Sequence, residues 1–490
     1  MKHIYNSLLL LLTVLLVSSC GNDWLDRDPA SGTPTESTIV SYENALTART
    51  GMYDGLQGNS SDPTYYAARM IYFGDVRGDD MRAEKQGSRS SSSYEMRYSV
   101  DDAPRIWNIP YNVIRRANNI IQAIDEKMVT DATDAQIGKL YAEAQVVRAL
   151  VHFDLVKIHA NPYTMDNGAS LGIPIVLKPE DGNFLPGRNT VAEVYTQIIK
   201  DLTEAINSGF LATDKTQGYM NLWSAKALLS RVYLYQGDNA NALSTAEDVI
   251  NNSPYKLWTN EEYANAWDKN HGSHTNEMIF EIVNASNSDW TDREGIAYLY
   301  HENGYADAVV TEAFMALLDQ NDVRQDLVLP ALYKLAFKEK YKDQKIFINK
   351  YPAEADNPEE MRLNNIPLFR LSEMYLTAAE AAFKSSDKTK AANYLTTIAQ
   401  RANPTAETMT EANVTLEKII IERRKELIGE GQRFFDAMRN NETIIRETEH
   451  YELINESRKF DRTYFRALLP IPISEVNANE IIRKQQNPGY

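Results

Sequence analysis

Cysteine is nearly absent from this sequence. Cys20 is the only cysteine among 490 residues, so the chain cannot form an internal disulfide. Long apolar runs are absent after Val17, whereas a membrane-spanning helix needs about 20 apolar residues. Basic residues are outnumbered by acidic ones, and the formal net charge is −17. Nucleic acids and anionic lipid surfaces bind basic protein faces, so neither is an expected partner.

Motifs for common catalytic chemistry are missing as well. The sequence has no nucleophile elbow, P-loop or dinucleotide fingerprint. His271 and His274 lie close together, but no glutamate stands in a HExxH relation to them, so we interpret them as part of a solvated loop. Asp319, Asn321 and Asp322 could offer oxygens to calcium, yet the EF-hand pattern is incomplete. We therefore predict no cofactor.

Acidic pairs leave one enzymatic alternative open. A glycoside hydrolase needs two carboxylates about 5 to 9 Å apart. Asp75, Asp79 and Asp80 form one candidate group, and Asp289 and Asp292 form another. Loop aspartates that bind sugar hydroxyls, or that are merely solvated, explain the same pattern. A surface glycosidase thus stays an alternative to our prediction that the protein is not an enzyme.

The first residues predict export and lipidation. The apolar run from Leu8 to Val17 is half the length of a spanning helix, which is typical of a signal peptide. It ends in Ser18-Ser19-Cys20, which resembles a bacterial lipobox. We predict a signal peptide over 1–19, an acylated tether over 20–36 and a binding domain over 37–490. Acyl chains on Cys20 would hold the domain at a membrane while its body stays in water.

Three stretches have the periodicity of paired amphipathic helices, at 106–158, 190–252 and 371–402. Alanines stand where neighbouring helices would approach, and each pair resembles the tetratricopeptide unit of roughly 34 residues. We predict a mostly α fold: an imperfect tetratricopeptide-like scaffold of helical pairs over about 106–252 and 368–440. Short strands are expected near 278–283 and 346–351.

Two long insertions interrupt this scaffold, at about 59–103 and 260–330. Binding residues are commonly carried on loops that a rigid scaffold positions. Both insertions are rich in polar and aromatic side chains, which suit the hydroxyls and ring faces of sugars. Trp107 and Trp223 belong to helical stripes instead, so we expect both in the core.

Several short motifs across the chain together resemble the SusD/RagB family. They are Cys20 with Trp24-Leu25-Asp26; Ala142-Glu143-Ala144, Arg148-Ala149 and Phe153-Asp154-Leu155; Phe369 to Leu376 with Ala379-Glu380-Ala381; Ile420 to Leu427 with Gly429 to Arg433; Leu468 to Pro472; and Gln486 to Tyr490. Within them, Glu422, Arg423, Glu426, Glu430, Arg433 and Asp436 are spaced for ion pairs along a helix. We also expect buried arginine–carboxylate pairs to fix how the helices dock.

This resemblance implies a SusD-like fold and a non-catalytic role. It implies a lipid-anchored protein of the outer membrane, facing the exterior, that captures an oligosaccharide. The protein would deliver this ligand to a SusC-type TonB-dependent transporter and act as its lid. Some relatives bind peptides, which remain an alternative ligand class in the same role.

We predict seven ligand-binding residues within the insertions. The first insertion supplies Asp75, Arg77, Tyr94 and Tyr98, and the second supplies Trp290, Tyr298 and Tyr300. Aromatic rings would stack on sugar faces while charged side chains bind ring hydroxyls.

Overall fold

The computed structural model describes most of the chain. The described residues are 38–58, 65–85, 87–102, 104, 106–180, 183–284, 295–301, 304–328, 345–352, 364–446 and 457–490. Helix accounts for 52% and strand for 6%, which confirms the predicted mostly helical class. No helix among these residues is long and apolar enough to cross a membrane.

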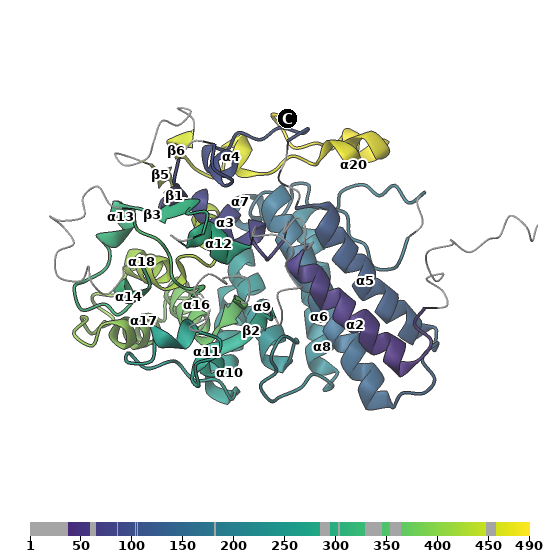
Figure 1. Cartoon of the computed structure of the whole chain (residues 1–490), viewed down its shortest axis with the longest axis horizontal. Coiled ribbons are helices and arrows are strands. Elements are labelled where there is room, and N and C mark those ends of the chain that lie inside the picture. The colour runs from purple at the N-terminus through teal and green to yellow at the C-terminus, as the bar shows by residue number, and fades with distance from the viewer. Residues whose placement is uncertain are drawn as a thin grey trace, which may run out of the picture.

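A continuous series of helices, each packed against the next, forms the scaffold. The series is α2 (Tyr42–Gln57), α5 (Asn108–Asp125), α6 (Asp134–His159), α8 (Val191–Asn207), α9 (Leu222–Gln236), α10 (Asn239–Asn252), α16 (Leu371–Lys384) and α17 (Lys388–Ala402), with α18 (Leu416–Leu427) against α16. Figure 1 shows α2, α5, α6 and α8 side by side along one side of the molecule. Packed helices thus occupy all three predicted stretches: α5 and α6 the first, α8 to α10 the second, which has three helices instead of a pair, and α16 and α17 the third.

Local sequence signals explain where these helices begin and end. Thr133 and Thr190 each form a capping box with the side chain three residues later, which satisfies backbone N–H groups at the first turn. Asn221 caps α9 in the same way, and Gly237, at φ 86°, ends it in the left-handed region. Trp107 and Trp223 are both buried, as expected.

The insertions and the chain end add short elements. The helices are α3 (Arg69–Val76), α4 (Ser91–Glu95), α7 (Tyr163–Asp166), α11 (His274–Glu277), α12 (Ile296–Tyr300), α13 (Glu312–Met315), α14 (Gln325–Val328), α19 (Arg433–Arg439), α20 (Ile473–Ala478) and α21 (Glu480–Arg483), with 3-10 turns at Asn265–Trp267 and Phe465–Ala467.

Within the described residues, strands form three antiparallel pairs. They are β1 (Met81–Ala83) with β3 (Ala308–Val310), β2 (Met278–Ile282) with β4 (Ile366–Arg370), and β5 (Ile444–Ile445) with β6 (Lys459–Phe460). The strand predicted near 278–283 is therefore confirmed. The one predicted near 346–351 is reduced to an isolated bridge between Ile346 and Val310.

Buried ion pairs join segments that are distant in sequence. Arg370 is 1% exposed, and its guanidinium contacts Glu277 at 2.7 Å, Glu426 at 3.0 Å and Glu430 at 2.7 Å. Arg423 likewise reaches Asp436 at 3.1 Å. The prediction that such pairs fix the docking of helices is supported. The spacing also predicted ion pairs along one helix among Glu422, Arg423, Glu426, Glu430, Arg433 and Asp436. This prediction was wrong for most of these residues, because their partners lie on other segments.

The closing motifs pack the chain end against α6. Leu469 N donates to Ile158 O, and Asn487 Nδ2 donates to both His159 O and Leu469 O. The buried Arg188 guanidinium donates to His159 O and to Asn487 Oδ1, at 3.0 and 2.9 Å. These bonds fix the C-terminal residues on the scaffold.

A candidate ligand-binding groove

The two insertions meet in space. The buried Tyr300 hydroxyl donates to Asp75 Oδ2 at 2.8 Å, and β1 of the first insertion pairs with β3 of the second. Ile296 N donates to Ala67 O, and Ala67 N donates to Gln57 O at the end of α2. Figure 1 shows α3, α12, β1 and β3 close together in the upper left part of the view.

Asp75, a predicted ligand-binding residue, lies in this junction and is 2% exposed. Its Oδ1 accepts from Gly431 N at 3.1 Å, so both carboxyl oxygens have intramolecular donors. Burial raises the pKa of Asp75 to about 8, although the hydrogen bonds from Tyr300 and Gly431 oppose the shift.

Arg77, Tyr94 and Tyr98 are buried as well. The Arg77 guanidinium carbon lies 3.4 Å from the Phe73 ring centroid and 3.6 Å from that of Phe434, and burial lowers the pKa of Arg77 to about 10. The Arg446 guanidinium carbon lies 4.8 Å from the Tyr94 ring centroid, and the Tyr98 hydroxyl donates to Arg466 O. All three side chains thus join the first insertion to the C-terminal third of the chain.

The predicted ligand-binding residues that the structure describes in the second insertion are buried as well. Tyr300 is fully buried, and Tyr298 is 4% exposed with its ring 6.1 Å from that of Tyr305. Trp290 lies outside the described residues. Among the six predicted residues that the structure describes, none presents its side chain to solvent. Direct ligand contact by these residues stays a prediction, and their described contacts are structural.

An open groove of about 340 Å³ lies beside this junction. Its volume is at the lower end of the range for small-molecule sites, roughly 300–1,000 Å³. Its lining combines aromatic and aliphatic side chains with polar ones. The lining residues are Thr50, Tyr53, Asp54, Gln57, Gln217, Gly218, Tyr219, Phe280, Ile282 and Val283.

Two tyrosines form an aromatic corner in the groove. The rings of Tyr53 and Tyr219 are 5.1 Å apart and perpendicular. Tyr53 is held in place because its hydroxyl donates to Glu143 at 3.1 Å and accepts from Met220 N at 2.9 Å. The Arg49 guanidinium lies 3.7 Å from the centroid of Tyr219, which remains half-buried and so keeps part of its surface available for stacking.

Side-chain amides fix one end of the groove. Gln57 Nε2 donates to Asn284 Oδ1 at 2.6 Å and to Val283 O at 3.2 Å. Asn284 Nδ2 in turn donates to Asn364 O, and Asn284 N donates to Asn365 Oδ1. Described residues that flank the ranges 59–64, 285–294 and 353–363 are therefore held together beside the groove.

Sequence reasoning missed the residues that line this groove. Tyr53 lies inside α2 between the buried Met52 and Leu56, where an aromatic residue is typical of core. Tyr219 follows Gly218, which adopts φ 74° and lies close to Val283. A glycine beside an aromatic residue, just before the cap of α9, is the signal that could have indicated Tyr219.

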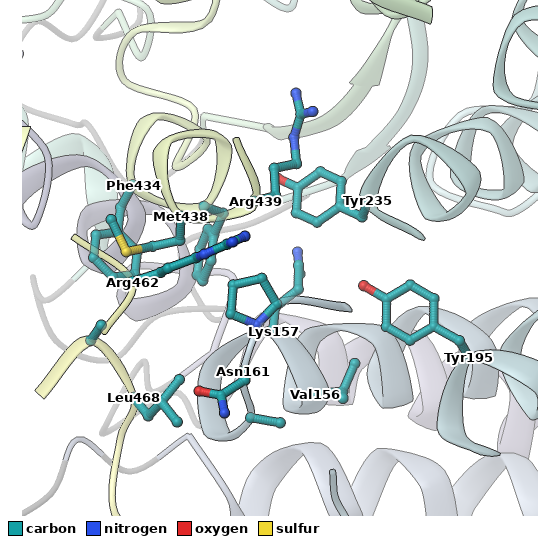
Figure 2. Close-up of a pocket in the computed structure, with 14 residues that line it drawn as sticks. Val156, Lys157, Asn161, Tyr195, Tyr235, Phe434, Met438, Arg439, Arg462 and Leu468 are labelled. Carbon is teal, nitrogen blue, oxygen red and sulfur yellow. The ribbon is translucent and has the colours of Figure 1, made fainter. Parts of the chain in front are cut away.

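A second cavity is too small to compete as a ligand site. It measures about 30 Å³, room for one or two waters, and lies between α6 and α19. Figure 2 shows Tyr195 and Tyr235 on one side of it and Phe434 and Met438 on the other. Lys157 points into it while paired to Asp154 at 3.0 Å. This cavity can hold water but not a sugar ring.

Of the acidic residues considered for hydrolysis, Asp79 and Asp80 are paired with arginines. Asp75 has a raised pKa but is buried, with both carboxyl oxygens hydrogen-bonded within the protein. Asp79 contacts Arg433 at 2.6 Å, and Arg424 donates to Asp80 at 3.0 Å. Burial alone would raise the pKa of Asp79, but the adjacent arginines lower it to about 2. A glycosidase acid needs a raised pKa in a substrate cleft, so this pair does not fit that role. Asp289 and Asp292 lie outside the described residues.

The residues considered for metals have other partners. Asp322 pairs with Arg324 at 2.6 Å, and the buried His274 contacts Glu281 at 2.8 Å. The interpretation of His274 as part of a solvated loop was wrong, because it packs in the core beside Trp258. Across the described residues, no group of three acidic, histidine or cysteine side chains is placed to hold a metal ion.

Comparisons with known proteins agree with this architecture. The model of the SusD family matches residues 187–490, and a model described as starch-binding associating with outer membrane matches residues 23–234. The structure of a putative sugar binding protein from Bacteroides vulgatus is 37% identical, with a TM-score of 0.82, and covers 93% of this chain and 100% of that one.

Two further relatives span nearly the whole chain. SusD-like protein P2 of Formosa agariphila is 26% identical over 97% of this chain and 98% of its own length. A laminarin binding SusD-like protein of known structure is 26% identical, with a TM-score of 0.69, over 92% of this chain and 100% of that one. The chain belongs to the SusD/RagB family of non-catalytic binding proteins.

Proposed function

We propose that this protein captures a nutrient oligosaccharide outside the cell and delivers it to a SusC-type TonB-dependent transporter, for which it acts as a lid. Acyl chains on Cys20 would anchor it to the outer membrane. The observation that carries the ligand proposal is the open groove with its aromatic corner. Family membership and the printed name of the laminarin-binding relative support a glycan ligand.

The groove offers the two kinds of contact that sugars need. The half-buried Tyr219 ring has the flat apolar surface on which a pyranose face stacks. Asp54 and Gln217 are exposed at the rim, where a carboxylate and an amide can bind ring hydroxyls. Trp290 follows Asn284 by six residues, and Asn284 accepts a hydrogen bond from the groove residue Gln57, so we retain Trp290 as a proposed ligand contact.

A binding screen tests this proposal. The chain from Gly21, which keeps every residue that the structure describes, would be screened against a glycan panel and a peptide mixture, with product analysis on the same samples. Binding of a glycan class without cleavage is the expected result. Binding of peptides alone would overturn the glycan assignment, and shortened glycan products would contradict the non-catalytic role.

Matched tyrosine variants locate the site. Tyr219→Ala should weaken glycan binding by about 5- to 100-fold, if removal of the ring costs roughly the 1–3 kcal/mol that removal of an aromatic stacking partner costs for nucleic-acid bases. Tyr394→Ala removes a half-buried tyrosine from α17, away from the groove, and should leave the affinity unchanged. Equal affinities of the two variants would place the ligand elsewhere.

The transporter proposal needs its own test. A SusC-type transporter encoded with this protein should co-purify with it from detergent-solubilised outer membranes. Purification of the lipoprotein alone under conditions that retain other membrane complexes would contradict the proposed partnership, whatever the ligand.

A further inference from the structure

One buried carboxylate links the two tyrosines of the aromatic corner. Glu143 on α6 is fully buried and does not line the groove. Its Oε2 accepts from Arg49 Nε at 2.5 Å, and its Oε1 accepts from Arg49 Nη2 at 2.8 Å. The Tyr53 hydroxyl donates to the same carboxylate at 3.1 Å. Glu143 therefore fixes the Arg49 guanidinium and the Tyr53 hydroxyl relative to each other.

Arg49 extends this constraint to Tyr219. Its guanidinium carbon lies 3.7 Å from the centroid of the Tyr219 ring, well inside the range of about 6 Å for a cation–π contact. Arg49 thus covers one face of this ring. The same carbon is 5.9 Å from the Tyr53 centroid, and the two rings are 5.1 Å apart, so Tyr53 lies at the edge of Tyr219. Neither residue covers the second face of Tyr219, which is the face left for a ligand.

Hydrogen bonds do not orient the Tyr219 ring. The Tyr219 carbonyl accepts from Thr216 Oγ1 at 2.7 Å, but among the described residues its hydroxyl has no hydrogen-bond partner. Contacts of the ring with Arg49 and Tyr53 therefore restrict its orientation. Without Arg49, the half-buried ring would have access to more than one side-chain rotamer.

We propose that Arg49, fixed by Glu143, is a positioning residue for the ligand groove, although neither side chain lines it. This inference rests on the proposed function. Arg49 orders the Tyr219 ring before binding, so the ligand does not have to order it. Immobilising one flexible side chain on binding costs about 2- to 12-fold in affinity, and a ring that is already ordered avoids this loss.

Arg49→Lys distinguishes positioning from charge compensation. The lysine ammonium can still pair with Glu143, so the buried carboxylate keeps a counter-charge and the variant should fold. It lacks the planar group that makes two parallel hydrogen bonds and lies flat on a ring. With laminarin, amylopectin, galactomannan and arabinoxylan as probes, we expect the affinity for each glycan that binds to fall about 2- to 12-fold. An affinity equal to that of the natural protein would overturn the inference.

Two further variants complete this comparison. Glu143→Gln should reproduce the loss of affinity, because only the oxygen of an amide can accept from Arg49. Asp201→Asn is the matched control, since the buried Asp201 on α8 accepts from two nitrogens of Arg148, at 2.8 and 2.7 Å, outside the groove. The control should lower stability and leave the affinity unchanged. Equal losses of affinity in both variants would assign the effect to stability and contradict positioning.

A double-mutant cycle tests whether Arg49 acts through Tyr219. In a protein that already carries Tyr219→Ala, Arg49→Lys should change the affinity by less than about twofold, because the ring that it positions is absent. The same loss with and without the Tyr219 ring would show that Arg49 acts by another route, against the inference.

A readout without ligand separates this inference from the proposed function. With 3-fluorotyrosine placed at position 219 alone, the ¹⁹F NMR resonance should shift or broaden in Arg49→Lys and Glu143→Gln but not in Asp201→Asn. An unchanged resonance in the first two variants would overturn the inference whether or not a glycan binds. Failure of every glycan to bind the natural protein would instead contradict the proposed function.

Discussion

The Asp75 carboxyl lies where water cannot solvate its charge. Burial raises its pKa to about 8, far above the value of about 3.9 for an aspartate in the unfolded chain. The folded state therefore binds the proton more tightly than the unfolded state does. The stability that this protonation contributes is complete at acidic pH and is lost as the pH rises toward 8.

We expect Asp75→Asn to flatten this pH dependence. The amide oxygen can accept from Gly431 N, and the amide nitrogen can donate to the Tyr300 hydroxyl once that hydroxyl turns from the donor role that it has toward Asp75. Relative to the variant, the natural protein should lose up to about 1.4 kcal/mol of unfolding free energy per pH unit between about pH 5 and 8. Urea unfolding across this range measures the difference, and parallel profiles would disprove the assignment.

Arg370 should be among the residues least tolerant of replacement. Arg370→Met would leave Glu277, Glu426 and Glu430 buried without their shared partner, which should lower the unfolding free energy by about 3–5 kcal/mol. Arg115→Met, at an exposed position on α5, should change it by less than about 0.5 kcal/mol. Chemical denaturation of both variants checks the contrast, and similar losses would count against the network.

Residue roles in the insertions were difficult to predict for a physical reason. A loop tyrosine has the same local sequence whether it faces a ligand or fills its own scaffold. Arg77 is buried because Phe434, distant in sequence, covers its guanidinium, and no local pattern encodes that pairing. Trp107 and Trp223 were predictable because helical periodicity alone placed them in the core.

At the scale of elements, two helical glycines should respond in opposite ways to the same substitution. A Cβ at Gly51 in α2 meets no atom within 4 Å, so Gly51→Ala should stabilise the protein by about 0.5–1 kcal/mol. A Cβ at Gly74 in α3 would overlap the Gly431 carbonyl, so Gly74→Ala should destabilise it. Thermal unfolding of both variants tests this, and a stabilised Gly74→Ala would contradict the close approach of α3 to that turn.

The long helices were predictable because cap, periodicity and terminating residue agree within each segment, as in α9 from Asn221 to Gly237. The strand pair β1–β3 was not, since each strand has three residues and their partners are more than 200 positions apart. The groove could not be predicted for the same reason. Its residues come from α2, β2 and the turn before α9, so only the tertiary fold assembles it.

For the molecule as a whole, the cellular location of the protein should depend on one side chain, because the predicted acyl anchor is attached at Cys20. Cys20→Ala should move the protein from the membrane fraction to the soluble fraction, because acyl chains supply the apolar area that holds it at the bilayer. Cell fractionation with metabolic labelling by a fatty acid checks this. A variant that still sediments with membranes and still carries label would refute the predicted anchor.

The hydrogen-bonded residues beside the groove have a consequence for how the loop sequences of such a protein can vary. Hydrogen bonds among Gln57, Asn284 and Asn364 hold together one flank of each of the ranges 59–64, 285–294 and 353–363. The bonds from Ala67 N to Gln57 O and from Ile296 N to Ala67 O hold the second flanks of the first two ranges. Lengthening a loop whose ends are already fixed adds little entropic cost, since that cost grows only slowly with length. The residues between these flanks can therefore be replaced by grafting other loop sequences, as in a library of variants, without changes to the helical scaffold.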